Sequence, residues 1–159
     1  MAKIKILGAD RNQFGGARPY GNVTTIRSVL ETGATGIPVR SNATAALAVN
    51  DVVQINTLQP GFLVEAVSLI VSNGFGAGVT ASLGFEYTDG VDRPELPQAA
   101  NYFGAGIDLA TVANLRLNLT KKLAKFPAGV TLLLTITGAA VAEAGYLDLI
   151  VHGEGLGAD

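Results

Sequence analysis

The stretch VTASLGFEYT, residues 79–88, alternates strictly between apolar and small or polar side chains. Successive side chains of a β-strand point to opposite faces, so a period of two sorts these residues onto two faces. The intervening positions are Thr, Ser, Gly and Glu, and the apolar face carries Val79, Ala81, Leu83, Phe85 and Tyr87. This alternation predicts a half-buried antiparallel strand whose apolar face lies in a core.

The same period of two returns along the rest of the chain. Further strands are expected at 23–29, 51–57, 62–72, 115–120, 130–137 and 146–153. Turn-forming residues separate these segments, as in QPG at 59–61 and FPAG at 126–129, because Gly allows positive φ and Pro fixes φ. About eight short strands without a convincing amphipathic helix predict an all-β fold, an antiparallel sandwich or a barrel. The alanine-rich stretches 43–49 and 139–144 leave short helices open as an alternative.

The composition is that of a globular but weakly charged chain. Apolar residues make up 48% of the 159 positions and charged residues only 15%, which is typical of one domain with its own core and not of a disordered chain. A surface so poor in charge indicates that partners cover part of it. The net charge of −2 provides no basic field for a polyanion, so we expect no direct nucleic-acid partner.

Further classes are excluded by what the sequence lacks. No cysteine is present, which rules out disulfides and thiolate metal sites. The N-terminal sequence has no apolar segment typical of a signal peptide, and Thr and Gly interrupt the longest apolar runs. We therefore expect synthesis in a cytoplasm and no membrane partner.

Residues that could carry chemistry are sparse. His152, the only histidine, lies on the more polar side of its strand, and any Ser–His–Asp triad would have to use it. Asp89, Asp92 and Glu95 follow a strand and leave a weak calcium site open, but their spacing differs from an EF-hand and favours a turn. The glycine-rich segment 8–22 lacks the Lys-Ser/Thr ending of a phosphate-binding loop. We expect no catalytic residues, no metal and no cofactor, and hence no enzyme.

The segment GADRNQFGGARPYGN, residues 8–22, combines flexible glycines with side chains typical of interface hot spots. Those side chains are Arg11, Phe14, Arg18 and Tyr20. A solvated tail gains nothing from two aromatic rings, so we favour an arm that lies on a neighbouring protein over a loosely ordered terminus. The expected organisation is a strand and flexible arm in residues 1–22, followed by one sandwich domain in 23–159.

Three longer segments, in this order, resemble the small cement or decoration proteins of tailed-bacteriophage heads. Residues 58–85, LQPGFLVEAVSLIVSNGFGAGVTASLGF, are similar to the Pro-Gly turn and two strands of that family. Residues 89–117, DGVDRPELPQAANYFGAGIDLATVANLRL, resemble its long inserted loop, with the elements NYF and IDLAT. Residues 128–155, AGVTLLLTITGAAVAEAGYLDLIVHGEG, look like its final hairpin. The order of the segments carries the resemblance more than any single motif does.

The resemblance implies a jelly-roll-like sandwich that forms homodimers or homotrimers and binds the major capsid protein on the outside of the virion. In that role many weak contacts, repeated by symmetry, stabilise the expanded head, and no catalysis or cofactor is involved. The arm would supply one set of contacts. Tyr102 and Phe103 in the long loop would supply a second, unless these two rings plug the end of the sandwich.

Two other classes of protein stay open at this point. A carbohydrate-binding or adhesion module of a phage or cell surface would need exposed aromatic platforms, and the chain has no Trp, six Phe and four Tyr. A hydrolase would need a base that only His152 or a pair of carboxylates could supply.

Overall fold

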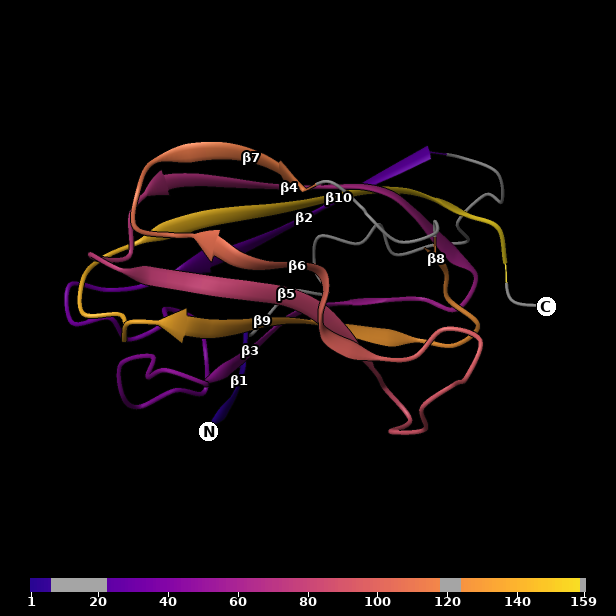
Figure 1. Cartoon of the computed structure of the whole chain (residues 1–159), viewed down its shortest axis with the longest axis horizontal. Coiled ribbons are helices and arrows are strands. Elements are labelled where there is room, and N and C mark those ends of the chain that lie inside the picture. The colour runs from indigo at the N-terminus through magenta and orange to yellow at the C-terminus, as the bar shows by residue number, and fades with distance from the viewer. Residues whose placement is uncertain (7–22, 118–123, 158–159) are drawn as a thin grey trace.

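The computed structural model describes residues 1–6, 23–117 and 124–157. Within these residues the chain forms strands, turns and irregular connections and no helix, which confirms the all-β prediction. Figure 1 shows two sheets stacked as layers. In chain order the strands are β1 (Lys3–Lys5), β2 (Val23–Glu31), β3 (Val52–Leu58), β4 (Phe62–Asn73), β5 (Val79–Tyr87), β6 (Ala99–Asp108), β7 (Ala113–Leu117), β8 (Ala124–Lys125), β9 (Val130–Gly138) and β10 (Tyr146–Gly155).

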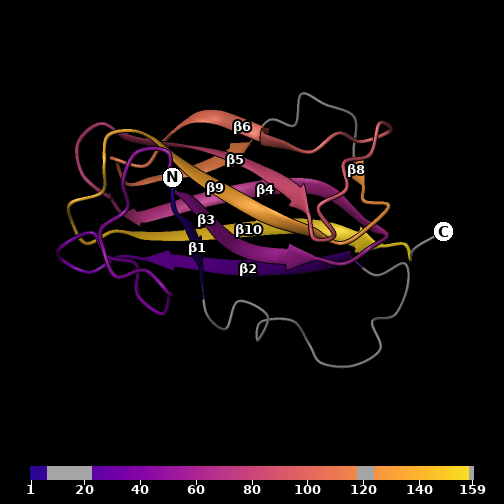
Figure 2. The same cartoon turned by 90° about the horizontal axis from the view of Figure 1, so that it is seen from below.

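The strand order makes the sandwich jelly-roll-like. The first sheet runs β1-β3-β9-β5-β6 and the second runs β2-β10-β4-β7, with the short β8 also paired to β4. Among the described strands every pairing is antiparallel except that of β1 with β3. The first long strand, β2, lies beside the last, β10, and most connections cross from one sheet to the other, as in double-sheet jelly rolls. Figure 2 shows the same two layers after a turn of 90°.

The core fills the space between the inward faces of the two sheets. The apolar face predicted for β5 is buried along its whole length, since Val79, Ala81, Leu83, Phe85 and Tyr87 are each at most 2% exposed. The faces predicted for β9 and β10 are buried in the same cluster, through Val130, Leu132, Leu134, Ile136, Leu147, Leu149 and Val151. The period of two therefore identified the core side of the long strands.

The N-terminal strand contributes to the same core. β1 pairs with β3, and both Ile4 within β1 and Ile6 just after it are buried. The carboxylate of Asp51 fixes this strand by accepting hydrogen bonds from the backbone N–H of Ala2 at 2.7 Å and of Ala48 at 3.0 Å. Burial by itself would raise the pKa of Asp51, but these hydrogen bonds hold the pKa below its ordinary value.

Two parts of the prediction differ from the structure. A strand, β6, lies in the middle of the region predicted as one long loop, residues 89–117. The alanine-rich stretches 43–49 and 139–144 form irregular connections and turns, so the alternative of short helices is wrong. Each of these stretches turns only one large side chain inward, Leu47 or Val141, and an amphipathic helix would need a repeated apolar face.

Replacing Leu134 with Asp should prevent stable folding, because this side chain is fully buried and a carboxylate there would lose its hydration. We expect a loss in the free energy of unfolding on the order of 4 kcal/mol or more, and the same for Leu83→Asp. Thermal unfolding followed by circular dichroism checks this expectation. Asn114→Asp, which adds the same charge at an exposed position of β7, is the control and should unfold close to the wild-type temperature. Wild-type stability of Leu134→Asp would contradict the core assignment.

Candidate functional site

The structure describes two of the six predicted contact residues. Arg11, Phe14, Arg18 and Tyr20 lie outside the described residues, so their role as an arm stays a prediction. Tyr102 and Phe103 belong to β6 and not to a long loop, which corrects the prediction at this point. Phe103 is only 4% exposed, whereas Tyr102 is partly exposed at the edge of the core.

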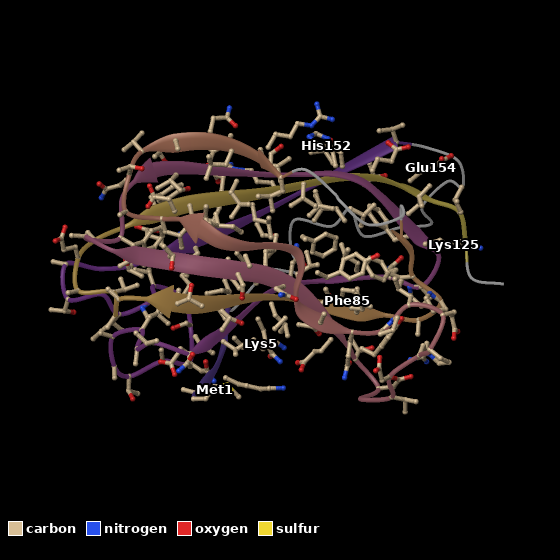
Figure 3. All side chains as sticks on the ribbon, viewed as in Figure 1. Met1, Lys5, Phe85, Lys125, His152 and Glu154 are labelled. Carbon is tan, nitrogen blue, oxygen red and sulfur yellow. The ribbon has the colours of Figure 1, made fainter. Side chains whose placement is uncertain are left out.

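Phe85 lies at the centre of an aromatic cluster between the two sheets (Figure 3). Its ring centroid is 5.6 Å from that of Tyr87, 5.0 Å from Tyr102, 6.3 Å from Phe103 and 4.9 Å from Phe126. The contacts with Tyr87, Tyr102 and Phe126 are edge-to-face, the arrangement that the quadrupole of an aromatic ring favours. Burial raises the pKa of both tyrosine hydroxyls. The rings therefore fill the end of the core toward which β5 runs.

β6 reaches this cluster through breaks in its pairing with β5. The register shifts on either side of Leu83, and the second shift leaves several residues of β6 without a partner on β5. Close approach of the two strands requires Gly84, because a Cβ there would lie 1.9 Å from the carbonyl oxygen of Ala99. The bulged segment contains Tyr102 and Phe103. Bulges destroy the period of two, which is why the sequence pattern did not predict β6.

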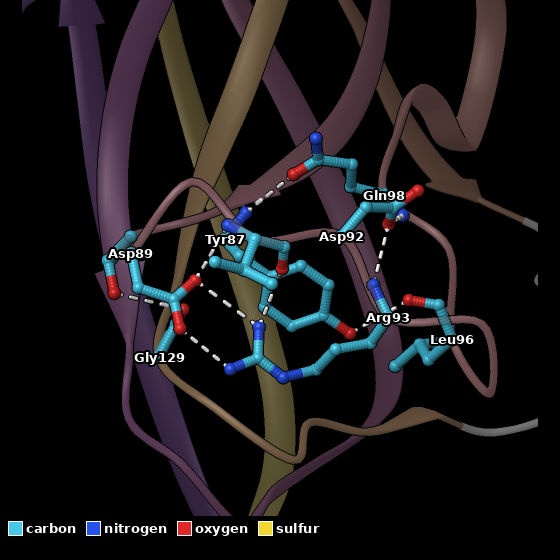
Figure 4. A network of polar contacts seen from close by, with 9 residues as sticks. Tyr87, Asp89, Asp92, Arg93, Leu96, Gln98 and Gly129 are labelled. Carbon is cyan, nitrogen blue, oxygen red and sulfur yellow. Dashed lines mark hydrogen bonds and ion pairs between the residues drawn. The ribbon is translucent and has the colours of Figure 1, made fainter.

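Residues 88–98, called here the Arg93 loop, connect β5 to β6 and are held by one guanidinium group (Figure 4). Arg93 binds both carboxylate oxygens of Asp89, with Nη2–Oδ2 at 2.7 Å and Nη1–Oδ1 at 3.2 Å. Nη1 also donates to the carbonyl oxygen of Val91 at 2.7 Å. The guanidinium carbon lies 4.4 Å from the ring centroid of Tyr87, which is a cation–π contact. The sequence signal for this ion pair was the spacing of four residues between Asp and Arg in DGVDRPE.

Further hydrogen bonds close the Arg93 loop on itself (Figure 4). The carboxylate of Asp92 accepts from the backbone N–H of Arg93 at 2.9 Å and of Gln98 at 2.8 Å. The side-chain oxygen of Gln98 accepts from the backbone N–H of Tyr87 at 3.0 Å, and the Tyr87 hydroxyl donates to the carbonyl oxygen of Leu96 at 2.8 Å. The loop is therefore preorganised, although most of its residues are exposed.

Two of the three carboxylates considered for calcium, Asp89 and Asp92, serve this turn. Hydrogen bonds from Arg93 and from the backbone N–H of Val91 lower the pKa of Asp89 to about 2. Asp92 is engaged by backbone N–H groups. Across residues 1–6, 23–117 and 124–157, no group of three His, Cys, Asp or Glu side chains is arranged to hold a metal ion. The geometry thus favours the structural turn.

His152 lies on the outward face of β10, a central strand of the second sheet (Figure 3). Its Nδ1 is 3.0 Å from the hydroxyl oxygen of Thr25 on the neighbouring β2. A catalytic nucleophile–base pair also needs a group that orients the base, and among the described residues no carboxylate contacts this ring. The two side chains form a cross-strand polar pair of the kind that stabilises sheets.

No helix in the described part of the chain is long and apolar enough to cross a membrane.

Comparisons with known proteins relate this fold to phage capsids. No protein-family model and no curated protein matches the chain. A chain of the capsid of Ralstonia phage GP4 superposes with a TM-score of 0.63 at 14% sequence identity, over 96% of this chain and 97% of that chain. A chain of the cyanophage Pam1 capsid asymmetric unit superposes with a TM-score of 0.57 at 14% identity, over 89% and 91%. At this identity the likeness shows a shared fold.

Titration of Asp89 by NMR tests the organisation of the Arg93 loop. We expect its carboxyl to titrate at about pH 2, below the ordinary value of about 3.9. Because the pKa is lowered in the folded protein, the contact with Arg93 favours the folded loop above about pH 4 and is lost as the pH falls toward 2. Arg93→Gln should return the Asp89 pKa toward its ordinary value and speed amide exchange in the loop. Arg116→Gln on β7, the control, should change neither, and an ordinary Asp89 pKa in the wild type would contradict the ion pair.

Proposed function

We propose that this chain is a structural virion protein that binds the outer surface of a phage head and cements neighbouring subunits of the major capsid protein. The observation that carries the proposal is the fold shared with a phage-capsid chain over nearly the full length of both chains. A second phage-capsid chain supports it over about nine-tenths of each chain. The resemblance of the sequence to head decoration proteins points in the same direction.

The physical properties of the chain support a structural role over a catalytic one. The described residues form a tightly packed sandwich in which the polar groups of the Arg93 loop and of His152 serve structural contacts. A rigid, weakly charged surface loses little conformational entropy on binding, which favours stable attachment through repeated contacts. Attachment to the virion exterior, with synthesis in the host cytoplasm, is part of this proposal.

The aromatic residues weigh against the carbohydrate-binding alternative. A glycan platform needs exposed rings, whereas most of the described aromatic rings are buried. Tyr102 and Tyr146 are the partly exposed ones among the described residues. Tyr102 stays a proposed contact to the capsid or to a neighbouring copy, while Phe103 lies in the core and supports it from beneath.

Co-sedimentation with expanded and unexpanded heads of the phage that encodes the chain tests this function. We expect saturable binding to expanded heads. The arm is best tested by the fourfold substitution Arg11→Ala, Phe14→Ser, Arg18→Ala, Tyr20→Ser, because deletion of residues 1–22 would also remove the buried Ile4 and Ile6. Loss of aromatic and Arg hot spots should weaken binding by about tenfold or more. Arg116→Ala with Val91→Ser, both exposed, is the control and should bind like the wild type.

Each outcome of this experiment has a distinct meaning. Absence of binding to either form of the head would overturn the proposed function and direct attention to a glycan screen. Full binding of the fourfold variant would keep the cement role but remove the arm from it. Equal binding to both head forms would argue against a role specific to the expanded shell.

A further inference from the structure

Two dipeptides of this chain have a sequence that favours spontaneous rearrangement of a side chain through a succinimide ring. In that reaction the backbone nitrogen of the second residue attacks the side-chain carbonyl carbon of the first, and glycine in the second place leaves the nitrogen unshielded. The sequence contains one Asn-Gly pair, Asn73–Gly74, and one Asp-Gly pair, Asp89–Gly90. Every other Asn is followed by a residue with a side chain.

Asn73 is the last residue of β4 and lies at the end of the sandwich opposite the Arg93 loop (Figure 1). Four connections form this end: residues 33–50, 74–78, 109–112 and 139–145. The exposed side chain of Asn73 donates from Nδ2 to the carbonyl oxygen of Ala144, which is also exposed, at 2.7 Å. Because the ends of a strand open more readily than its middle, the peptide bond to Gly74 can reorient while water reaches the amide.

Ring closure at Asn73 joins the Gly74 nitrogen to Cγ of Asn73 and breaks the bond between Cγ and Nδ2. The proton of the Gly74 N–H leaves with the amide group as ammonia. Water then opens the succinimide at either of its two carbonyl carbons. One product is an aspartate, and the other is an isoaspartate, whose main chain runs through the former side chain and is longer by one carbon.

Both products disturb contacts that order this end of the sandwich. An ionised carboxylate only accepts hydrogen bonds, so an aspartate would replace the donor to Ala144 by a second acceptor. An isoaspartate lengthens the chain directly before Gly74, where a Cβ would already lie 2.1 Å from the carbonyl oxygen of Ala110. The next residue, Phe75, is fully buried, and its N–H donates to the carbonyl oxygen of Leu109 at 2.9 Å. The added atom therefore displaces a core side chain.

The neighbouring connections have little room to absorb such a shift. A Cβ at Gly145 would lie 2.3 Å from the ring of Phe75, and a Cβ at Gly36 would lie 2.2 Å from the carbonyl oxygen of Val141. Leu47 and Val141 are at most 1% exposed, and the N–H of Val141 donates to the carbonyl oxygen of Leu47 at 2.9 Å. A change at the end of β4 therefore spreads to the connections packed against it.

The Asp89–Gly90 pair is held against the same reaction. Its nucleophile is engaged, because the N–H of Gly90 donates to the carbonyl oxygen of Tyr87 at 3.1 Å. Both carboxylate oxygens of Asp89 are bound by Arg93, and Oδ1 also accepts from the N–H of Val91 at 3.0 Å. These contacts lower the pKa of Asp89 to about 2, so at neutral pH fewer molecules carry the protonated carboxyl that loses water on ring closure.

We propose that Asn73 is a spontaneous modification site of the folded protein, where loss of ammonia yields aspartate and isoaspartate and loosens this end of the sandwich. Arg93 keeps the other succinimide-forming pair, Asp89–Gly90, closed to the reaction. The proposal does not depend on head binding, because it concerns the chemistry of the folded chain with water as the co-reactant.

Peptide mapping by mass spectrometry, after incubation of the folded protein at mildly alkaline pH, tests the proposal. Cleavage after glutamate separates the two sites, since Asn73 falls in residues 66–86 and Asp89 in residues 87–95. We expect residues 66–86 to gain the mass difference between an amide and an acid and to be labelled by an isoaspartate methyltransferase. Arg93→Gln should raise isoaspartate in residues 87–95 by about tenfold or more, because a larger fraction of Asp89 is then protonated. Arg116→Gln, the control, should behave as the wild type.

The chain unfolded in urea is the reference, because unfolding removes the protective contacts. Folded protein that keeps the Asn73 amide while the unfolded chain loses it would overturn the proposal. So would loss of ammonia at Asn101 or Asn114 as fast as at Asn73, since glycine would then not decide the site. Equal isoaspartate at Asp89 in the wild type and in Arg93→Gln would contradict the protective role of Arg93.

Two variants of Asn73 separate the reaction from its consequence. Asn73→Gln keeps an amide donor but would need a larger ring, so its residues 66–86 should keep their mass. Asn73→Asp imitates one product and should lower the unfolding temperature by about 3 °C, because one hydrogen bond is lost. Asn114→Asp adds the same charge at an exposed position and should unfold close to the wild-type temperature. An unchanged unfolding temperature of Asn73→Asp would overturn the proposed loosening.

Discussion

The pairing of β5 with β9 is the constraint on which the rest of the sandwich depends. The two strands keep one register over nine consecutive residue pairs, from Val79 with Gly138 to Tyr87 with Val130. This register places the apolar faces of both strands on the same side, where they meet the inward face of β10. A slip by one residue would turn every one of these side chains away from the core, to the outer face of the sheet. The core therefore specifies the register, and the register specifies where each connection leaves the sheets.

The two ends of the sandwich differ in the interactions that order their connections. At one end the Arg93 loop is ordered by polar contacts: an ion pair, a cation–π contact and two carboxylates bound within the turn. At the other end, four nearly uncharged connections are ordered by buried apolar anchors and close backbone contacts. The polar contacts at the Arg93 loop engage Asp89, Asp92 and Arg93, so the two ends are ordered by different kinds of interaction.

Much of the fold could be predicted from alternation, and the failures have physical causes. The strands with unbroken alternation, such as β5 and β10, were found with their core faces. β6 was missed because bulges in its pairing with β5, next to Gly84, break the period of two. The close approach of the two strands there depends on Gly84 lying against Ala99, which is distant in sequence. The aromatic pair Tyr102 and Phe103 was found as a feature, but its environment depends on that unpredicted strand. The packing of the four connections 33–50, 74–78, 109–112 and 139–145 against one another could not be foreseen, since only the topology brings these segments together.

The proposed strengthening of a phage head from outside is tested most directly by the temperature at which heads release their DNA. Expanded heads lacking the protein should be heated with and without saturating amounts of it, and DNA release followed by the fluorescence of a nucleic-acid dye. Because repeated contacts across subunit junctions must break together, we expect release at a temperature higher by several degrees when the protein is bound. An unchanged release temperature, with binding confirmed on the same heads, would contradict the cement role.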